Sequence, residues 1–306
     1  MKTKSSLFRI VLFGLLIAAI FGCKKESSIA VLPMTIYTGI SDGPLNIAFD
    51  GTNMWSCNIR NSVTKITPAG VMTTYSGTGN LPSNIAFDGI NMWTSNRQDD
   101  NVTRITPAGE MTTYSFTGNA PYGIAFDGVN MWTANQGGPS VTKITASGVM
   151  TNFSFSGNPN PYGITFDGTY IWTANYGENS ITRITTAGVM KTFTGTGKGP
   201  SSIASDKINM WTTNIEDNSV TRITPTGVMT TFKGTGNMPV GIAFDGTNMW
   251  TANQGGASIS KITPSGVITN YPLIGSNPNP TGIAFDGTYL WVTSPGVYGV
   301  IKITIR

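Results

Sequence analysis

The sequence predicts an all-β fold, a seven-bladed β-propeller of four-stranded antiparallel blades, and two observations lead to this prediction. One unit of roughly 39 residues recurs seven times, a length typical of repeat folds. Each of the first six units holds four short apolar or Thr-rich segments between turn residues, without the period of a helix. One tryptophan marks each copy: Trp55, Trp93, Trp132, Trp172, Trp211, Trp250 and Trp291.

The sixth copy illustrates the four expected strands. It reads PVGIAFDGTNMWTANQGGASISKITPSGVITNYP over residues 239–272. Asp-Gly, a hairpin signal, separates the first strand, GIAF, from the second, MWTAN. A loop of varied sequence precedes the third strand, and a Gly-containing turn precedes the fourth. Because one such unit cannot cover both of its faces alone, neighbouring units are expected to pack against each other radially.

The two ends of the repeat region complement each other. The seventh unit stops after its third strand, VIKITIR, whereas VLPMTIYT at residues 31–38 matches the fourth strand of the other units. We therefore expect the N-terminal strand to complete the last blade and to close the ring, which leaves no open seam between the two ends.

Residues 1–22 have the pattern of a bacterial lipoprotein signal peptide, with basic residues before an apolar run that ends IFGC. Cleavage makes Cys23 the lipidated N-terminus. A tether over residues 23–30 then leads to the propeller at residues 31–306. We expect an exported protein that is lipid-anchored to the bacterial outer membrane or cell surface.

Charge and composition exclude several functions. Three of the 19 basic residues and none of the 15 acidic residues lie in the signal, which leaves 16 against 15. Since these bases are spread evenly over the repeats, no nucleic-acid surface is expected, and membrane contact is expected only through the lipid anchor. The chain has no histidine, the usual base near neutral pH and a common metal ligand, so no catalytic residue, metal or cofactor is expected.

Candidate ligand-binding residues lie where the second strand ends. The third residue after each Trp is an amide in six units, and a ring of amides offers donors and acceptors without charge. Alternatively, each amide bonds the loop of its own blade. The loops that follow vary while the strands do not, which indicates a binding surface for a carbohydrate, peptide or protein. The candidates are Asn58, Asn96, Asn135, Asn175, Asn214, Asn253, Ser294, Tyr122 and Tyr162.

The copy PYGITFDGTYIWTANYGENSITRITTAGVMKTF resembles the repeat of streptogramin (virginiamycin B) lyases and their NHL-like propeller relatives. The resemblance covers residues 31–306 and implies their fold. Those lyases open a cyclic lactone antibiotic by elimination, with two histidines and with glutamates that hold magnesium. At the matching positions this chain has Thr281 and Val240 for the histidines, and Asn279 and Pro295 for the carboxylates.

These replacements argue against the lyase activity, because threonine without an activating partner does not abstract a proton from carbon. We expect a surface-exposed, lipid-anchored binding module without catalytic activity, whose ligand lies on the rim of strand-two ends and second-to-third-strand loops. The alternatives are a lyase-like enzyme that uses a non-histidine residue set, and a structural envelope protein.

Overall fold

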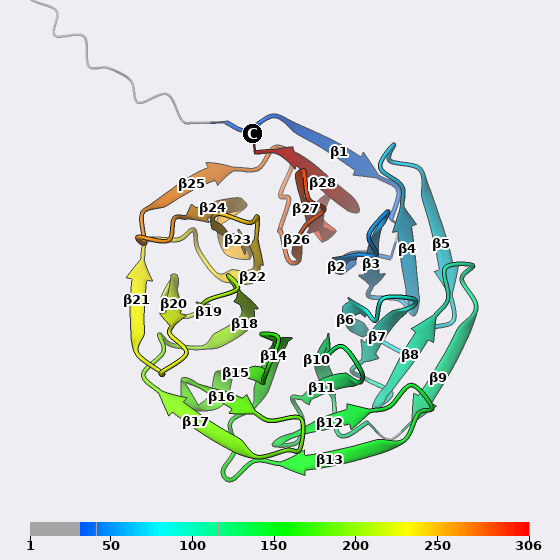
Figure 1. Ribbon diagram of the computed structural model, residues 1–306. Coiled ribbons are helices and arrows are strands. Elements are labelled where there is room, and N and C mark those ends of the chain that lie inside the picture. Colours follow the sequence, from blue (N-terminus) through cyan, green and yellow to red (C-terminus); the bar gives the residue numbers. More distant parts are fainter. Residues whose placement is uncertain (1–30, 41, 116, 306) are drawn as a thin grey trace, which may run out of the picture. The chain divides into compact units, whose positions relative to one another are not determined.

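Each repeat forms four antiparallel strands, and the seven resulting sheets are arranged as the blades of a ring (Figure 1). The structure, a computed structural model, describes residues 31–40, 42–115 and 117–305. The predicted signal at 1–22, the lipidation site Cys23 and the tether at 23–30 lie outside the described residues. The seven-bladed propeller predicted from the repeats is confirmed.

In each of the first six blades, the four strands follow one another in chain order from the axis outwards. The innermost strands are β2 (Pro44–Phe49), β6 (Pro82–Phe87), β10 (Pro121–Phe126), β14 (Pro161–Phe166), β18 (Pro200–Ser205), β22 (Pro239–Phe244) and β26 (Ile283–Phe285). The second strands are β3 (Met54–Asn58), β7 (Met92–Asn96), β11 (Met131–Asn135), β15 (Ile171–Asn175), β19 (Met210–Asn214), β23 (Met249–Asn253) and β27 (Tyr289–Ser294).

The third strands are β4 (Ser62–Ile66), β8 (Asn101–Ile105), β12 (Ser140–Ile144), β16 (Ser180–Ile184), β20 (Ser219–Ile223), β24 (Ser258–Ile262) and β28 (Gly299–Thr304). The outermost strands are β5 (Met72–Ser76), β9 (Met111–Ser115), β13 (Met150–Ser154), β17 (Met190–Thr194), β21 (Met229–Lys233), β25 (Ile268–Pro272) and β1 (Met34–Thr38). Single turns of 3₁₀ helix follow three of the second strands, as η1 (Tyr176–Glu178), η2 (Gln254–Gly256) and η3 (Pro295–Val297). No helix among the described residues is long and apolar enough to cross a membrane.

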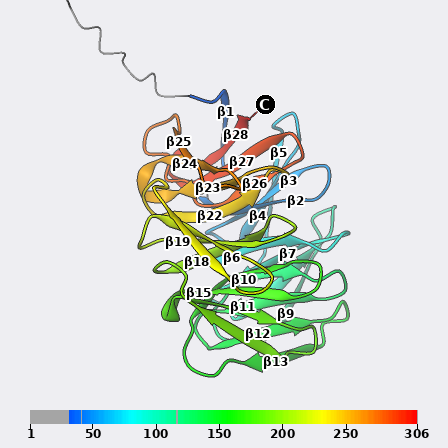
Figure 2. The same ribbon diagram turned by 60° about the vertical axis from the view of Figure 1, so that its left-hand side comes forward.

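The ring has two faces, whose names we use below. The Asp-turn face carries the turns between first and second strands, such as Asp50 to Asn53, and the turns between third and fourth strands. The loop face carries the second-to-third-strand loops and the connections from one blade to the next. Figure 2 shows the blades from the side, with their strands running between these faces.

The N-terminal strand closes the ring, as predicted. β1 lies antiparallel to β28, with Met34 opposite Ile303 and Thr38 opposite Gly299, so the last blade has the strand order β1-β28-β27-β26. The ring of Tyr37 stacks on Trp291 with a centroid separation of 5.7 Å. Blades seven and one then share an apolar cluster in which Trp291 packs with Ile47 and other residues of the first blade.

The tryptophans pack one blade against the next. Trp132, which is fully buried, belongs to the third blade and shares a cluster with Ile164, Ile171 and Ile184 of the fourth. On its own sheet the indole stacks on Phe153. A fully buried aromatic side chain of this size dominates the energy of such an interface, so the repeated Trp is the main blade-to-blade contact.

Candidate functional site

The six predicted amides lie inside the blades and do not form a ring on the surface. Each of the six side chains is fully buried. In the third blade, the Asn135 amide donates to Ser140 and Thr142 at 2.9 and 3.0 Å and accepts from Thr133. The other five amides donate two equivalent hydrogen bonds each, and all of them except Asn214 also accept one from the second strand: Asn58, Asn96, Asn175, Asn214 and Asn253.

The physical reason is the position of the second strand, which lies between two strands of its own sheet and between two neighbouring blades. Its last residue therefore faces the third strand instead of solvent. Ser294, the equivalent residue of the seventh blade, is also fully buried and donates its hydroxyl hydrogen to the carbonyl of Pro278. The amide ring predicted as a ligand-binding surface is corrected accordingly: these residues hold the strands of one blade together.

A cavity of about 150 Å³ lies instead at the mouth of the central channel on the loop face. Its lining comes mainly from the two residues that follow the first proline of each blade. We call it the channel-mouth cavity, and it is lined by Leu45, Asn46, Ser83, Asn84, Tyr122, Gly163, Ser201, Ser202, Val240, Gln254 and Thr281. All seven blades thus contribute to the lining, the sixth through Val240 and the seventh through Thr281 at the same position of the repeat.

The hydrogen bonds of the lining determine what the cavity offers to a ligand. Asn46 and Asn84 each use Oδ1 to accept the N–H of the following residue, at 2.8 Å in both cases. Ser83 donates to the carbonyl of Leu81, so its oxygen retains the capacity to accept. None of the lining residues is charged, and the cavity therefore presents amide and hydroxyl groups.

One sector of the mouth is aromatic. Tyr122 and Tyr162, both predicted at this rim, contact each other with ring centroids 4.8 Å apart, and Tyr162 contacts Tyr176 at 5.2 Å. The Arg97 guanidinium lies over Tyr122 at 5.9 Å. Burial and, secondarily, the neighbouring Tyr162 raise the pKa of Tyr122. Its phenol therefore stays protonated at neutral pH and can donate a hydrogen bond.

The acidic side chains on the loop face are engaged in holding loops. Asp99 accepts the backbone N–H of Asn80 at 2.8 Å, and Asp217 accepts that of Lys198 at the same distance. Glu216 accepts a 2.7 Å hydrogen bond from the Tyr176 hydroxyl, and this bond raises the pKa of that tyrosine. These carboxylates tie successive connections together across the face.

Two of the positions that resemble the lyase site, Thr281 and Val240, line the cavity. The Thr281 hydroxyl donates to the carbonyl of Leu45 at 2.6 Å and lies 3.1 Å from the Thr293 hydroxyl. Val240 lines the same cavity with an apolar side chain. Thr281 therefore links the seventh blade to the first, and its hydroxyl already has two partners.

The side chains at the magnesium positions do not fit that ion. Asn279, in a left-handed backbone conformation, offers a neutral amide, and Pro295 begins η3 without any side-chain donor. Magnesium prefers carboxylate oxygens in near-octahedral geometry. Over residues 31–40, 42–115 and 117–305, no three histidine, cysteine or carboxylate side chains gather in a group that could hold a metal.

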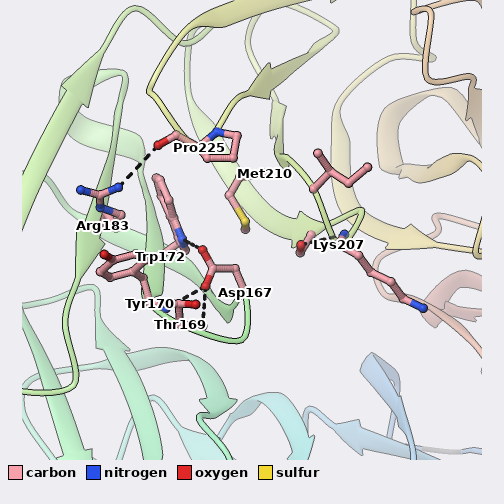
Figure 3. A pocket seen from close by; sticks show the side chains of 10 residues that line it. Asp167, Thr169, Tyr170, Trp172, Arg183, Lys207, Met210 and Pro225 are labelled. Carbon is pink, nitrogen blue, oxygen red and sulfur yellow. Dashed lines mark hydrogen bonds between the residues drawn. The ribbon is translucent and has the colours of Figure 1, made fainter.

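A second cavity, of about 210 Å³, lies on the Asp-turn face between the fourth and fifth blades (Figure 3). Asp167 there accepts the indole N–H of Trp172 and two backbone N–H groups. Arg183 stacks on Tyr170 at 4.5 Å and reaches the carbonyl of Pro225 in the next blade. Cavities of about 170 and 250 Å³ repeat at equivalent positions between other blades, so this groove arises from the way in which neighbouring blades meet.

Cys57 is equally structural. It is fully buried, and burial raises the pKa of its thiol to about 12. The thiolate needed for nucleophilic or metal chemistry is therefore disfavoured.

The sequence contained one signal for the cavity that the repeat comparison passed over. The two residues after the first proline differ between blades, as in Leu45-Asn46, Ser83-Asn84 and Ser201-Ser202, while the strand that follows is nearly constant. Variation at a fixed position of a constant scaffold is typical of a binding surface. Asn46, Asn84 and Gln254 were not predicted, because the candidate residues were selected at the end of the second strand, where the amides are buried.

Comparisons with known proteins agree with this geometry. The profile of the virginiamycin B lyase family matches residues 36–194 and 129–306. A solved streptogramin B lyase structure superposes with a TM-score of 0.82 at 22% identity and covers 90% of this chain and 98% of that one. A comparison with curated protein sequences found no match.

Two structures of virginiamycin B lyase from Staphylococcus aureus are also similar. The selenomethionine-substituted protein gives a TM-score of 0.78 at 26% identity, covering 90% of this chain and 99% of that chain. A catalytically inactive histidine-to-alanine variant with quinupristin gives a TM-score of 0.80 at 25% identity, covering 90% of this chain and 100% of that chain. Because the family profile spans all seven blades, the chain belongs to the virginiamycin B lyase family.

Proposed function

We propose that this member of the family is a non-catalytic binding module, exported and lipid-anchored at Cys23, that holds an uncharged ligand in the channel-mouth cavity. The observation that carries the proposal is the state of Thr281. Its hydroxyl is bonded to the Leu45 carbonyl, and Val240 lies at the other position that resembles a lyase histidine. Neither side chain is a base that removes a proton from carbon.

The cavity chemistry favours a carbohydrate among the three ligand classes. Asn46 and Asn84 have their carbonyl oxygens occupied, so their NH₂ groups are the atoms left to bond a ligand oxygen. The ring of Tyr122 adds an apolar surface with a hydroxyl donor. Hydroxyl-rich, uncharged sugars combine acceptors with apolar ring faces, which this set of groups complements.

Titration calorimetry of the mature chain with neutral oligosaccharides, chitotriose and maltotriose first, tests the proposal. We expect Tyr122→Ala to weaken binding roughly tenfold, since it removes the apolar surface against which the sugar packs. Asn84→Ala removes the amide donor and is expected to act in the same direction. The matched control is Tyr298→Ala, an exposed tyrosine of the loop face that does not line the cavity.

The alternative, a lyase-like enzyme, is favoured by the family match and is tested separately. We expect incubation with quinupristin to leave its ring intact, as judged by mass spectrometry. Ring opening would overturn the non-catalytic assignment. Sugar binding that ignores both Tyr122→Ala and Asn84→Ala would place the ligand elsewhere, and the absence of any binding would leave a structural role in the envelope.

A further inference from the structure

The Asp-turn face exposes aliphatic side chains at equivalent turns. Ile90, Val129 and Ile208 follow the Asp turns of three blades and are 71–74% exposed. Valines occupy the turns between third and fourth strands in five blades, with 61–68% exposure: Val71, Val149, Val189, Val228 and Val267. On the loop face, the large apolar side chains Ile59, Met238 and Ile274 are less exposed, at 39–44%. Tyr298 of the same face is 60% exposed.

An apolar groove opens on the same face between the second and third blades. Its volume is about 170 Å³, and Trp93, Phe126 and Met131 form part of its lining. Ile90 and Val129, two of the exposed residues, line it as well. Ile90 and Val129 thus meet at one apolar groove, and apolar side chains that lie together indicate an interaction site, whereas single exposed ones do not.

The chain enters the ring at this face. β1 begins at Met34, opposite Ile303 near the end of β28, and the N–H of Thr304 donates to the Pro33 carbonyl at 2.9 Å. Ile303 and Thr304 lie at the Asp-turn end of the last blade, because Thr304 is opposite Tyr289 just after the turn at Asp286. The described chain therefore enters β1 from the Asp-turn face.

The charges of this face nearly balance. Each blade contributes one turn aspartate and one third-strand base, Lys207 and Glu110 add one charge of each sign, and Lys191, opposite Arg183, adds one further positive charge. The bases are also engaged, as in Arg222, which donates to the Pro264 carbonyl at 2.8 Å and stacks near Trp211. A partner that recognises charge, whether nucleic acid or a strongly acidic or basic protein, is therefore disfavoured.

We propose that the Asp-turn face docks on the lipid bilayer to which the chain is tethered, with the aliphatic side chains of its turns inserted among the lipid headgroups. The inference rests on the proposed lipidation of Cys23 and adds a second membrane contact to the lipid anchor, which was the one membrane contact expected from the sequence. The seven residues between Cys23 and Val31 reach at most roughly 25 Å, which keeps the face at high effective concentration near the membrane. Apolar insertion at the headgroup boundary then needs no net charge.

The test measures depth directly in the full mature chain reconstituted in phosphatidylcholine vesicles. A fluorophore sensitive to its environment is attached to Val129→Cys, and in a second sample to Tyr298→Cys on the loop face. Cys57 does not compete for the label, because it is fully buried. Quenchers attached to the lipid chains are expected to remove most of the emission at position 129 and little at position 298.

A second measurement removes the apolar contacts without disturbing the turns. The triple variant Ile90→Thr, Val129→Thr, Ile208→Thr places at each site the residue that Thr52, Thr169, Thr247 and Thr288 already provide in the other blades. We expect each replacement to weaken vesicle partition of the unlipidated Cys23→Ser chain by up to roughly tenfold. The control is Ile59→Thr on the loop face, which should change nothing.

The outcomes separate the docking from the anchoring. Mass spectrometry of the N-terminal peptide reports the lipid on Cys23, whatever the depth measurement gives. Equal quenching at positions 129 and 298 in the lipidated chain would overturn the docking while the anchor stands. If Cys23 carries no lipid, the proposed anchor is wrong. The docking is then decided by whether the triple variant weakens vesicle partition of the Cys23→Ser chain. Partition that falls steeply with salt would also contradict it, because the charges of the face nearly cancel.

Discussion

The carboxylate of Asp245 accepts a 2.7 Å hydrogen bond from the indole N–H of Trp250, and both side chains are buried. The other oxygen of Asp245 accepts the backbone N–H groups of Thr247 and Asn248. The same Asp–Trp bond recurs in every blade at 2.6–2.7 Å. One carboxylate thus fixes a turn and orients the side chain that packs on the next blade.

Replacing this carboxylate by an amide tests the link. In Asp245→Asn, only one of the two oxygens that accept hydrogen bonds remains. The new NH₂ group is a donor, and it faces either the indole N–H or the backbone N–H groups of the turn. We expect a loss of about 1–3 kcal/mol of unfolding free energy, measured by urea denaturation. Combined with Trp250→Phe, the two losses should not add, because both remove the same bond. Full additivity would show that the turn alone matters.

The aspartates also set the acid limit of the fold. Burial tends to raise the pKa of Asp50, Asp88, Asp206 and Asp245, but hydrogen bonds from backbone and indole N–H groups outweigh it and hold each pKa below the usual 3.8. Their stabilisation is complete above that value and is lost as pH falls through the lowered folded-state pKa.

Because the chain has no histidine, we expect urea midpoints to stay nearly constant between about pH 5 and 8 and to fall steeply only below about pH 4. Asp245→Asn should show a shallower slope in the acid range, since it takes up one proton fewer. A fall that begins near neutral pH would contradict this assignment.

The buried amides give a matched pair of variants. Asn135 makes three side-chain hydrogen bonds, whereas in the fifth blade Thr212 donates to the carbonyl of Thr213, and the oxygen of Asn214 is buried without a partner. We expect Asn135→Ala to cost about 1–3 kcal/mol and Asn214→Ala measurably less. Equal losses in urea denaturation would show that the oxygen contributes nothing.

The closing strand is tested by truncation. Removing residues 24–38 deletes β1 and exposes the edge of β28 together with Trp291, against which Tyr37 stacks. We expect the calorimetric melting temperature to fall by many degrees and the protein to associate through the open edge. The control removes residues 24–30 and leaves β1 in place. A control that melts as low as the longer deletion would assign the effect to the tether.

Cys57 makes the fold sensitive to alkali. Burial raises the pKa of its thiol from 9.0 to about 12, so its contribution is complete below pH 9 and is lost as pH rises towards the folded-state value. Cys57→Ala introduces the residue present at Ala134, Ala174 and Ala252. We expect it to be nearly neutral at pH 7 and to lessen the decline in urea midpoint above pH 9. An unaltered decline would point to the tyrosines instead.

Most of the fold could be predicted from the sequence because the repeat states it seven times. The interval between tryptophans, the Asp turns and the match of residues 31–38 to a fourth strand gave the blade number, the strand order and the closure. The expected packing of neighbouring blades is confirmed, and Trp132 lies at one of these contacts. The bond from each indole to its Asp was not predicted, since a spacing of five residues across a turn does not reveal which atoms meet.

The site was harder to predict because burial in a propeller does not alternate along a strand. All five residues of β11 are buried, so the polar Asn135 gives no sign of its direction. Thr281 and Val240 were located through the family resemblance, and the structure places both at the channel mouth. Asn46 and Asn84 could not be predicted as cavity residues, because it is the curvature of the ring that brings the inner strands of distant blades together.

The pairing of β1 with β28 also dictates an order of events. Met34 lies opposite Ile303, so the first strand finds its partner only when both ends of the propeller come together. Contacts between such distant parts of a chain form late in folding. Six blades can assemble from neighbouring residues, while the seventh waits for β1. The folding protein is therefore an unfinished arc until one late step closes the ring.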